Sequence, residues 1–193
     1  WGNVLSTASI IWFDEDYTKD DMTEESFYYE EPELFISKKP TYSFCAVGGH
    51  NAQPHNHNDV GSFIITNDDK VILNDLGSGK YTKDYFVPAT RYNYLVTGSQ
   101  GHSVPIINGT YQIAGRDHSA KNVSCSDKHF ELELQDAYED GIIEKIHRCF
   151  LLEESSIILT DTFSYSDKTE SVTERFVTKT KPEIKDDCII INN

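Results

Sequence analysis

From residue 33 onward, short runs of β-favouring residues alternate with turn-forming residues, and this pattern limits the folds open to the chain. Strand-like runs recur throughout, for example SFIIT at 62–66, HFELEL at 129–134 and SIILTDTF at 156–163. Hairpin-type turns follow such runs at NDDK, EDG and EES. Helical segments long enough to connect parallel strands are missing after residue 33. We therefore predict an all-β fold, a two-sheet antiparallel β-sandwich over residues 33–193.

The first 32 residues differ in character from the rest. Apolar residues in VLSTASIIWF, at 4–13, recur at the spacing of a helix, and a strongly acidic run follows at 13–33. A charge-rich run of this kind favours a solvated linker or lid, and a long polar connection is unusual inside a compact domain. We expect residues 1–32 to be the last helix of a preceding domain plus an acidic linker, so that the chain begins inside a longer protein.

Charge and cysteine usage disfavour several classes of protein. The formal net charge of -15 and the isoelectric point near 4.7 argue against a nucleic-acid partner, which needs a basic face. The sequence has no apolar run long enough to span a membrane, so we predict no membrane partner. The four cysteines are widely spaced and form no CxxC pair, which argues against a zinc ribbon or a redox motif and predicts buried free thiols.

Three histidines are concentrated in the segment HNAQPHNHNDVGSF, at residues 50–63. If this segment is extended, His55, His57 and Asp59 share one face, because side chains alternate along a strand. The following run, SFIITNDDKVILND, has the pattern of a hairpin, and its return strand would bring Asp75 back close to His57. The sequence therefore predicts that a carboxylate lies beside the imidazoles.

His102, in SQGHSVPII, also directly precedes an apolar strand, which places it at the same end of the predicted sandwich. Two imidazoles and one carboxylate form a common catalytic metal set that suits zinc and leaves one position open. His57, Asp75 and His102 are therefore the metal candidates, for one zinc ion per chain. An iron facial triad uses the same ligand types, and a solvated strand edge needs no metal, so both alternatives stay open. Surface or core roles are expected for His118, His129 and His147.

The segments HNHNDVGSFIITNDDKVILNDLGSGKY and GHSVPIINGTYQ resemble the heparinase II/III-like polysaccharide lyases, and the similarity covers most of residues 33–178. The resemblance implies a C-terminal β-sandwich joined to an N-terminal α-helical toroid, whose final helix would match VLSTASIIWF. It implies that His57, Asp75 and His102 bind the family's metal, usually assigned as zinc, in a structural or site-organising role. His55 matches a histidine that faces the substrate cleft and is implicated in proton transfer.

Other cleft positions follow from the same resemblance. Arg91 and Tyr92, in PATRYNYL, lie where related enzymes place polar cleft residues. We expect Arg91 and Asn56 to bind substrate and Tyr92 to take part in catalysis. The chain departs from the family after the third histidine, where Ser103 replaces an amide that such enzymes often carry.

The resemblance implies a lyase that cleaves uronate-containing polysaccharides or oligosaccharides by β-elimination, with an acidic glycan as its partner. In this family the toroid supplies further catalytic groups, so we expect the chain to act with its upstream toroid domain and to be inactive, or nearly so, alone. A noncatalytic metal-stabilised carbohydrate-binding or interaction module is the main alternative, and an iron-dependent oxygenase is a third. The family favours a periplasmic or extracellular location, with the bacterial cytoplasm as the other option.

Overall fold

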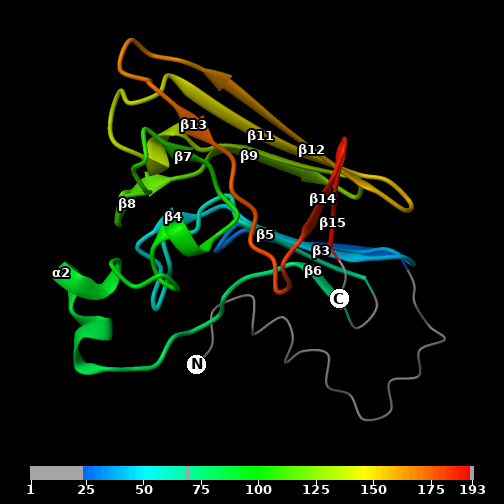
Figure 1. Cartoon of the computed structure of the whole chain (residues 1–193), viewed down its shortest axis with the longest axis horizontal. Coiled ribbons are helices and arrows are strands. Elements are labelled where there is room, and N and C mark those ends of the chain that lie inside the picture. Colours follow the sequence, from blue (N-terminus) through cyan, green and yellow to red (C-terminus); the bar gives the residue numbers. More distant parts are fainter. Residues whose placement is uncertain (1–23, 68–69, 192–193) are drawn as a thin grey trace.

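Two antiparallel sheets face each other in the computed structural model, which describes residues 24–67 and 70–191 (Figure 1). The first sheet has the order β1-β2-β3-β5-β6, with β1 at Glu25–Tyr29, β2 at Leu34–Lys38, β3 at Ser43–Val47, β5 at Phe63–Asn67 and β6 at Lys70–Leu73. The second has the order β12-β11-β10-β9, with β9 at Lys121–Ser126, β10 at His129–Glu133, β11 at Lys145–Leu152 and β12 at Ile157–Ser164. The predicted antiparallel sandwich is confirmed.

The core lies between these two layers and is rich in phenylalanine. Phe35 of β2 stacks on Phe130 of β10 with ring centroids 5.3 Å apart. Phe150 of β11 lies 4.9 Å from both Phe44 of β3 and Phe63 of β5. Strict alternation in β11 buries every second residue, as expected for a strand with one face on the core. These aromatic contacts join the two sheets directly, since each ring buries a large apolar area.

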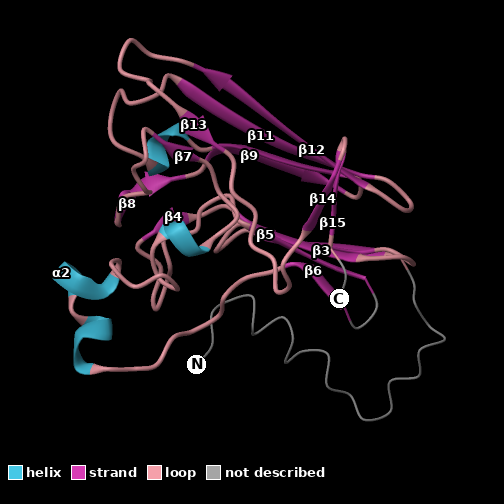
Figure 2. Cartoon of the chain, viewed as in Figure 1, coloured by secondary structure: helices cyan, strands magenta, loops and turns pink. Residues whose placement is uncertain are grey.

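Shorter elements connect the layers and gather mostly at one end of the sandwich (Figure 2). Three pairs of short strands are β4 at His50–Asn51 with β8 at Gly115–Ser119, β7 at Ile106–Ile107 with β13 at Val172–Thr173, and β14 at Glu183–Lys185 with β15 at Cys188–Ile190. The short helices are η1 at Lys83–Phe86, α2 at Pro88–Arg91, η2 at Ser99–Gly101 and η3 at Gln135–Ala137. No described helix is long and apolar enough to cross a membrane.

Two features differ from the sequence-based expectations. Strand β1 lies inside the segment that the acidic run predicts as a linker, and it extends the first sheet as an edge strand with mostly exposed side chains. Pairing with β2 supplies its backbone hydrogen bonds, and three of its five residues, Phe27, Tyr28 and Tyr29, are aromatic residues that favour strands. The expected helix at 4–13 lies outside the described residues, and the division near residue 32 stays a prediction. The cysteines are free, as predicted, but the expectation of burial is wrong, because Cys45, Cys125 and Cys149 are partly exposed and Cys188 is exposed.

Candidate functional site

Four potential metal ligands meet near the end of the sandwich at which the short elements gather. His57 and Asp59 come from the loop before β5, Asp75 from the segment after β6, and His102 from the residue after η2. Their candidate ligand atoms all lie within 4.8 Å of one another. The β5–β6 hairpin is present, and it returns Asp75 to His57 as the sequence predicts. The three predicted metal candidates are therefore brought together, with Asp59 as a fourth.

The pairing of His102 with Asp75 fixes the orientation of both side chains. His102 Nε2 lies 3.2 Å from the Val96 carbonyl, which can only accept, so we assign the proton of the neutral ring to Nε2. Nδ1 then points its lone pair at Asp75 Oδ2, only 2.8 Å away. The other carboxylate oxygen, Oδ1, accepts a 2.7 Å hydrogen bond from the Gly77 amide. Two electron-rich atoms at this distance repel unless a proton or a metal cation lies between them.

The electrostatics of this pair agree with that conclusion. Burial opposes a charge on His102, but the hydrogen bond to Asp75 and the negative charges of Asp59 and Asp75 outweigh it, so the pKa of His102 is raised. Burial would likewise raise the pKa of Asp75, yet its contact with His102 and with the Gly77 amide lowers it. The pocket thus favours positive charge at the position between His102 Nδ1 and Asp75.

His57 supplies the most informative atom of the cluster. Its Nδ1 is buried and has no hydrogen-bond partner among the described residues, and its ring centroid lies 5.3 Å from that of His102. Burial, together with the neighbouring charge of His102, lowers the pKa of His57 to about 4, so the ring is neutral at neutral pH. A neutral imidazole with a buried, unsatisfied nitrogen fits a metal ligand, because an unmet polar group is otherwise costly inside a protein.

Asp59 joins the cluster although the reasoning that grouped it with His55 is wrong. His55 has φ 61°, in the left-handed region, and the segment turns instead of running extended. The turn leaves His55 exposed while His57 is buried, so these two side chains do not share a face. Burial raises the pKa of Asp59 to about 6. A carboxyl held in this environment can serve as a further oxygen ligand once a cation is present.

The other predicted site residues surround this cluster. Exposed His55 meets Phe86 edge-on, with centroids 6.2 Å apart. The Asn56 carbonyl accepts a 2.5 Å hydrogen bond from Arg91, and its side-chain oxygen accepts one of 3.1 Å from the Tyr92 hydroxyl. Arg91 is only 9% exposed and also donates to the Tyr85 carbonyl, so its guanidinium is committed to holding two segments together. The predicted cleft residues are brought together, and their roles toward a substrate stay predictions.

A buried arginine supports the loops that carry the metal candidates. Arg148 Nη1 donates 2.8 Å hydrogen bonds to the carbonyls of Gly61 and Ser103, which lie two residues beyond Asp59 and one beyond His102. The same guanidinium pairs with Asp161 at 2.6 Å and with Glu174 at 3.3 Å. The arginine therefore ties two ligand-bearing loops to the second sheet.

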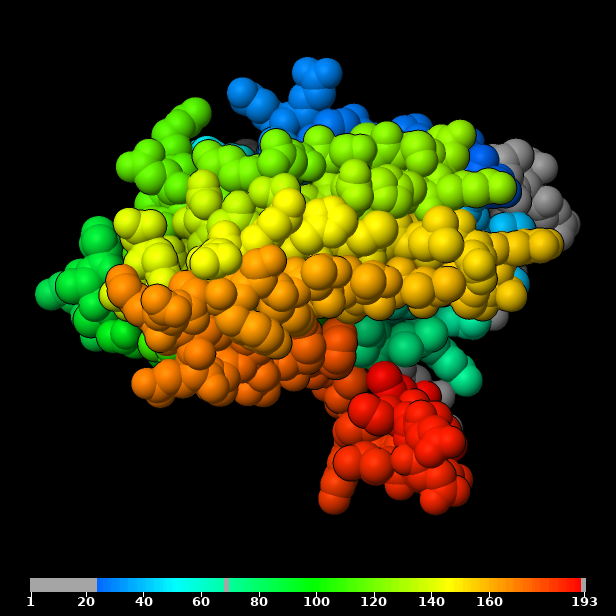
Figure 3. Space-filling view, turned by 90° about the horizontal axis from the view of Figure 1, so that it is seen from above, coloured from blue at the N-terminus to red at the C-terminus, as the bar shows by residue number. Residues whose placement is uncertain are grey.

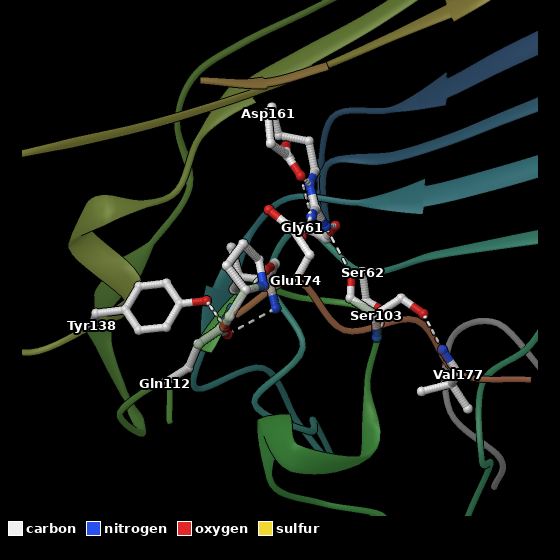
Figure 4. Close-up of polar contacts among 11 residues, drawn as sticks. Gly61, Ser62, Ser103, Gln112, Tyr138, Asp161, Glu174 and Val177 are labelled. Atoms are coloured by element: carbon white, nitrogen blue, oxygen red, sulfur yellow. Dashed lines mark hydrogen bonds and ion pairs between the residues drawn. The ribbon is translucent and has the colours of Figure 1, made fainter. Parts of the chain in front are cut away.

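A second buried group holds the same loop from the other side. The Gln112 side chain accepts a 3.1 Å hydrogen bond from the Val60 amide and donates one of 2.8 Å to the Val60 carbonyl. Asn58 donates to the Gln112 carbonyl at 3.1 Å. Ser103, the departure from the family pattern, receives a 3.0 Å hydrogen bond from the Val177 amide at its hydroxyl (Figure 4). The residues on both sides of Asp59, Asn58 and Val60, are thus held by buried hydrogen bonds to Gln112.

Sequence reasoning did not identify Arg148 or Gln112 as supporting residues. A signal for Arg148 was present, since the alternation in KIHRCFLL puts it on the same face as Ile146 and Phe150. A charged residue on a core-facing position requires partners. Gln112 lies within the NGTYQ segment, but its spacing does not indicate which backbone it contacts.

Comparison with known families is consistent with this arrangement. A family model described as heparinase II/III-like, C-terminal, matches residues 36–189. The matched segment includes both sheets apart from β1 and the first two residues of β2, and it includes all the candidate site residues described above. A search of curated proteins finds no match.

Proposed function

Because the chain belongs to the heparinase II/III-like C-terminal domain family, we propose that it is the sandwich domain of a polysaccharide lyase acting on uronate-containing glycans by β-elimination. The observation that carries the proposal is the convergence of His57, Asp75 and His102 in one buried cluster, two residues from the exposed imidazole of His55. Such a site combines a buried, rigid centre with an adjacent group that a large ligand can reach.

The reaction has three chemical requirements. The uronate carboxylate must be neutralised by hydrogen bonds or positive charge, since the hydrogen at C5 is otherwise only weakly acidic. A base must then remove this proton, and an acid must protonate the departing oxygen at C4. An imidazole suits the base role, because its ordinary pKa of about 6.5 leaves a neutral ring available near pH 7.

We assign the base role to His55 and place Tyr92 beside it. His55 is exposed, and the Phe86 ring at its edge limits the directions in which the imidazole can point. The Tyr92 hydroxyl donates a hydrogen bond to Asn56, the residue after His55, so the phenol is held next to the loop that carries the imidazole. Asn56 and the Arg91 charge behind it would favour an anionic ligand at this surface.

A metal ion fits the residues of the buried cluster. His57, Asp75 and His102 would hold it, with Asp59 as an additional oxygen ligand, and this mixed nitrogen and oxygen set suits zinc. When bound, zinc would neutralise the two carboxylates and fix the three segments that carry the ligands relative to one another. In this proposal the chain's own residues act on the substrate, and the ion organises the loop that presents His55.

The substrate and the partner domain are parts of the same proposal. The family suggests an acidic polysaccharide, although the net charge of -15 requires that binding be local, near Arg91 and the lysines at 80 and 83. We infer that an upstream toroid domain supplies the remaining groups that the reaction needs. The chain alone is therefore expected to have little or no activity.

The test is turnover of uronate polymers by the protein that contains this domain, followed through the ultraviolet absorbance of the unsaturated product. We expect His55→Ala to lower kcat by at least 100-fold, in line with the loss of a general base, and His118→Ala, a control distant in sequence, to leave it unchanged. Normal turnover by His55→Ala would refute the base assignment. No product from any uronate polymer would favour the noncatalytic carbohydrate-binding module instead.

A further inference from the structure

The outer face of the second sheet carries a second group of metal-ligand side chains. In β10 and β11 the core-facing residues alternate with His129, Glu131, His147 and Cys149, all of which are partly exposed. Glu131 and Cys149 are directly paired across the two strands, so their side chains lie side by side on this face. Figure 3 looks onto it, with the strands crossing the molecule as bands from yellow-green to orange. The face is open to solvent, whereas the first cluster is buried.

The geometry of this group centres on one carboxylate oxygen. Oε2 of Glu131 lies 3.3 Å from His129 Nε2 and 3.1 Å from His147 Nε2. The candidate ligand atoms of His129, Glu131 and Cys149 are all within 4.8 Å of one another. An ordinary surface ion pair joins one cationic and one anionic side chain. Here two imidazoles converge on a single carboxylate oxygen, and a thiol lies beside them.

We propose that His129, Glu131 and Cys149 form a second metal site, for a divalent ion of the zinc type. A set with one nitrogen, one oxygen and one sulfur ligand suits borderline-soft ions such as zinc and disfavours magnesium or calcium, which take oxygen ligands. His147 would hold the Glu131 carboxylate in place through their contact. None of these residues belongs to the buried cluster of the first site, so this proposal stands independently of the lyase assignment.

Binding at this site is a simple exchange of cations. The thiolate of Cys149 is the ligand form, so the ion displaces the thiol proton, which is released to solvent. Three protein ligands leave one coordination position open, as in catalytic rather than structural zinc sites. A depression lined by Glu131, His147, Asn122, Lys145 and Thr162 adjoins the proposed site on the Glu131 side.

The test is titration of the metal-free whole chain with zinc alone, and in parallel with cobalt, whose thiolate complexes give a charge-transfer absorption band. We expect the band to appear with the wild-type protein and to vanish in Cys149→Ser. Cys188→Ser, which removes an exposed cysteine on the β14–β15 hairpin, is the matched control and should keep the band. Glu131→Gln should weaken binding at this site at least 10-fold, and His147→Ala by about 10- to 100-fold.

Two results would overturn the proposal. One is a wild-type protein that binds cobalt without a thiolate band, and the other is a band that persists in Cys149→Ser. The cobalt band reports on thiolate coordination and not on turnover. Failure of the lyase proposal would therefore leave this test unchanged. The circular dichroism spectrum of each variant checks that the sheet is intact, and Glu131→Gln provides a second, near-isosteric variant.

Discussion

Two buried polar centres lie close together in the sandwich and differ in how their polar atoms are satisfied. Around Arg148, the guanidinium donates to Asp161, Glu174 and the carbonyls of two loops, so its donors are used within the protein. Around His102, Nδ1 lies 2.8 Å from Asp75 Oδ2, a contact that needs a proton or a metal cation between the two atoms, and His57 Nδ1 has no hydrogen-bond partner among the described residues. The first centre is complete as it stands, while the second leaves the His57 nitrogen without a partner and needs a proton or a metal cation between His102 and Asp75.

This difference separates a structural centre from the candidate metal centre. Arg148 joins the loops that follow Asp59 and His102 to Asp161 on β12, so the complete centre holds the incomplete one in place. If all polar atoms of the buried cluster were paired within the protein, a bound ion would add no new interaction. In the proposed function, the unpaired Nδ1 of His57 belongs to a preformed site, and a bound metal would supply the interaction that this nitrogen lacks.

The largest effect is expected from breaking the complete centre. Arg148→Met keeps the apolar stem but leaves buried Asp161 and two carbonyls without their donor. Removal of one partner from a buried ion pair costs about 3–5 kcal/mol, and added zinc should not restore it. Denaturant unfolding measures the loss, with the exposed Arg116→Met as the control. A loss below about 1 kcal/mol, which is typical of surface pairs, would contradict this view of the centre.

A smaller effect is expected from trimming the incomplete centre. Asp59→Asn keeps the size of the side chain but removes one of the two carboxylates of the cluster, those of Asp59 and Asp75. Zinc affinity should therefore fall by about 10- to 100-fold. The free energy of unfolding without metal should change little or rise, since burial already raises the pKa of Asp59 to about 6. Calorimetric titration checks the affinity. Equal affinity in wild type and variant would remove Asp59 from the ligand set.

The smallest expected effect is a pH dependence at the edge of the complete centre. Burial, and then the charge of Asp161, raises the pKa of Glu174 to about 7, above its usual value of 4.5. A raised carboxyl pKa gives stability that is fully present below pH 4.5 and is lost as pH rises through 7. Glu174→Gln removes this titration, so its stability relative to wild type should increase between pH 5 and pH 8. A difference that stays constant across this range would contradict the raised pKa.

Much of this comparison follows from the sequence, because alternation and hairpin spacing are local signals. The SFIITNDDKVILND hairpin predicted that Asp75 returns to His57, and the structure agrees. The side chain of His55 could not be placed, since its left-handed backbone depends on the fold around the loop. The support given by Arg148 was also missed, because its partners Ser103 and Gly61 lie 45 and 87 positions away from it in the chain. Long-range pairing of this kind leaves no periodic pattern in a sequence.

The central claim is that the buried cluster binds a metal ion, and the most direct test is elemental analysis of the chain purified without added metal. We predict that His57→Ala lowers the metal content by about one ion per chain relative to wild type and lowers the melting temperature, while His118→Ala leaves the metal content unchanged. The same metal content in wild type and His57→Ala would contradict the claim, and the cluster would then be a polar loop stabilised by a proton between His102 and Asp75.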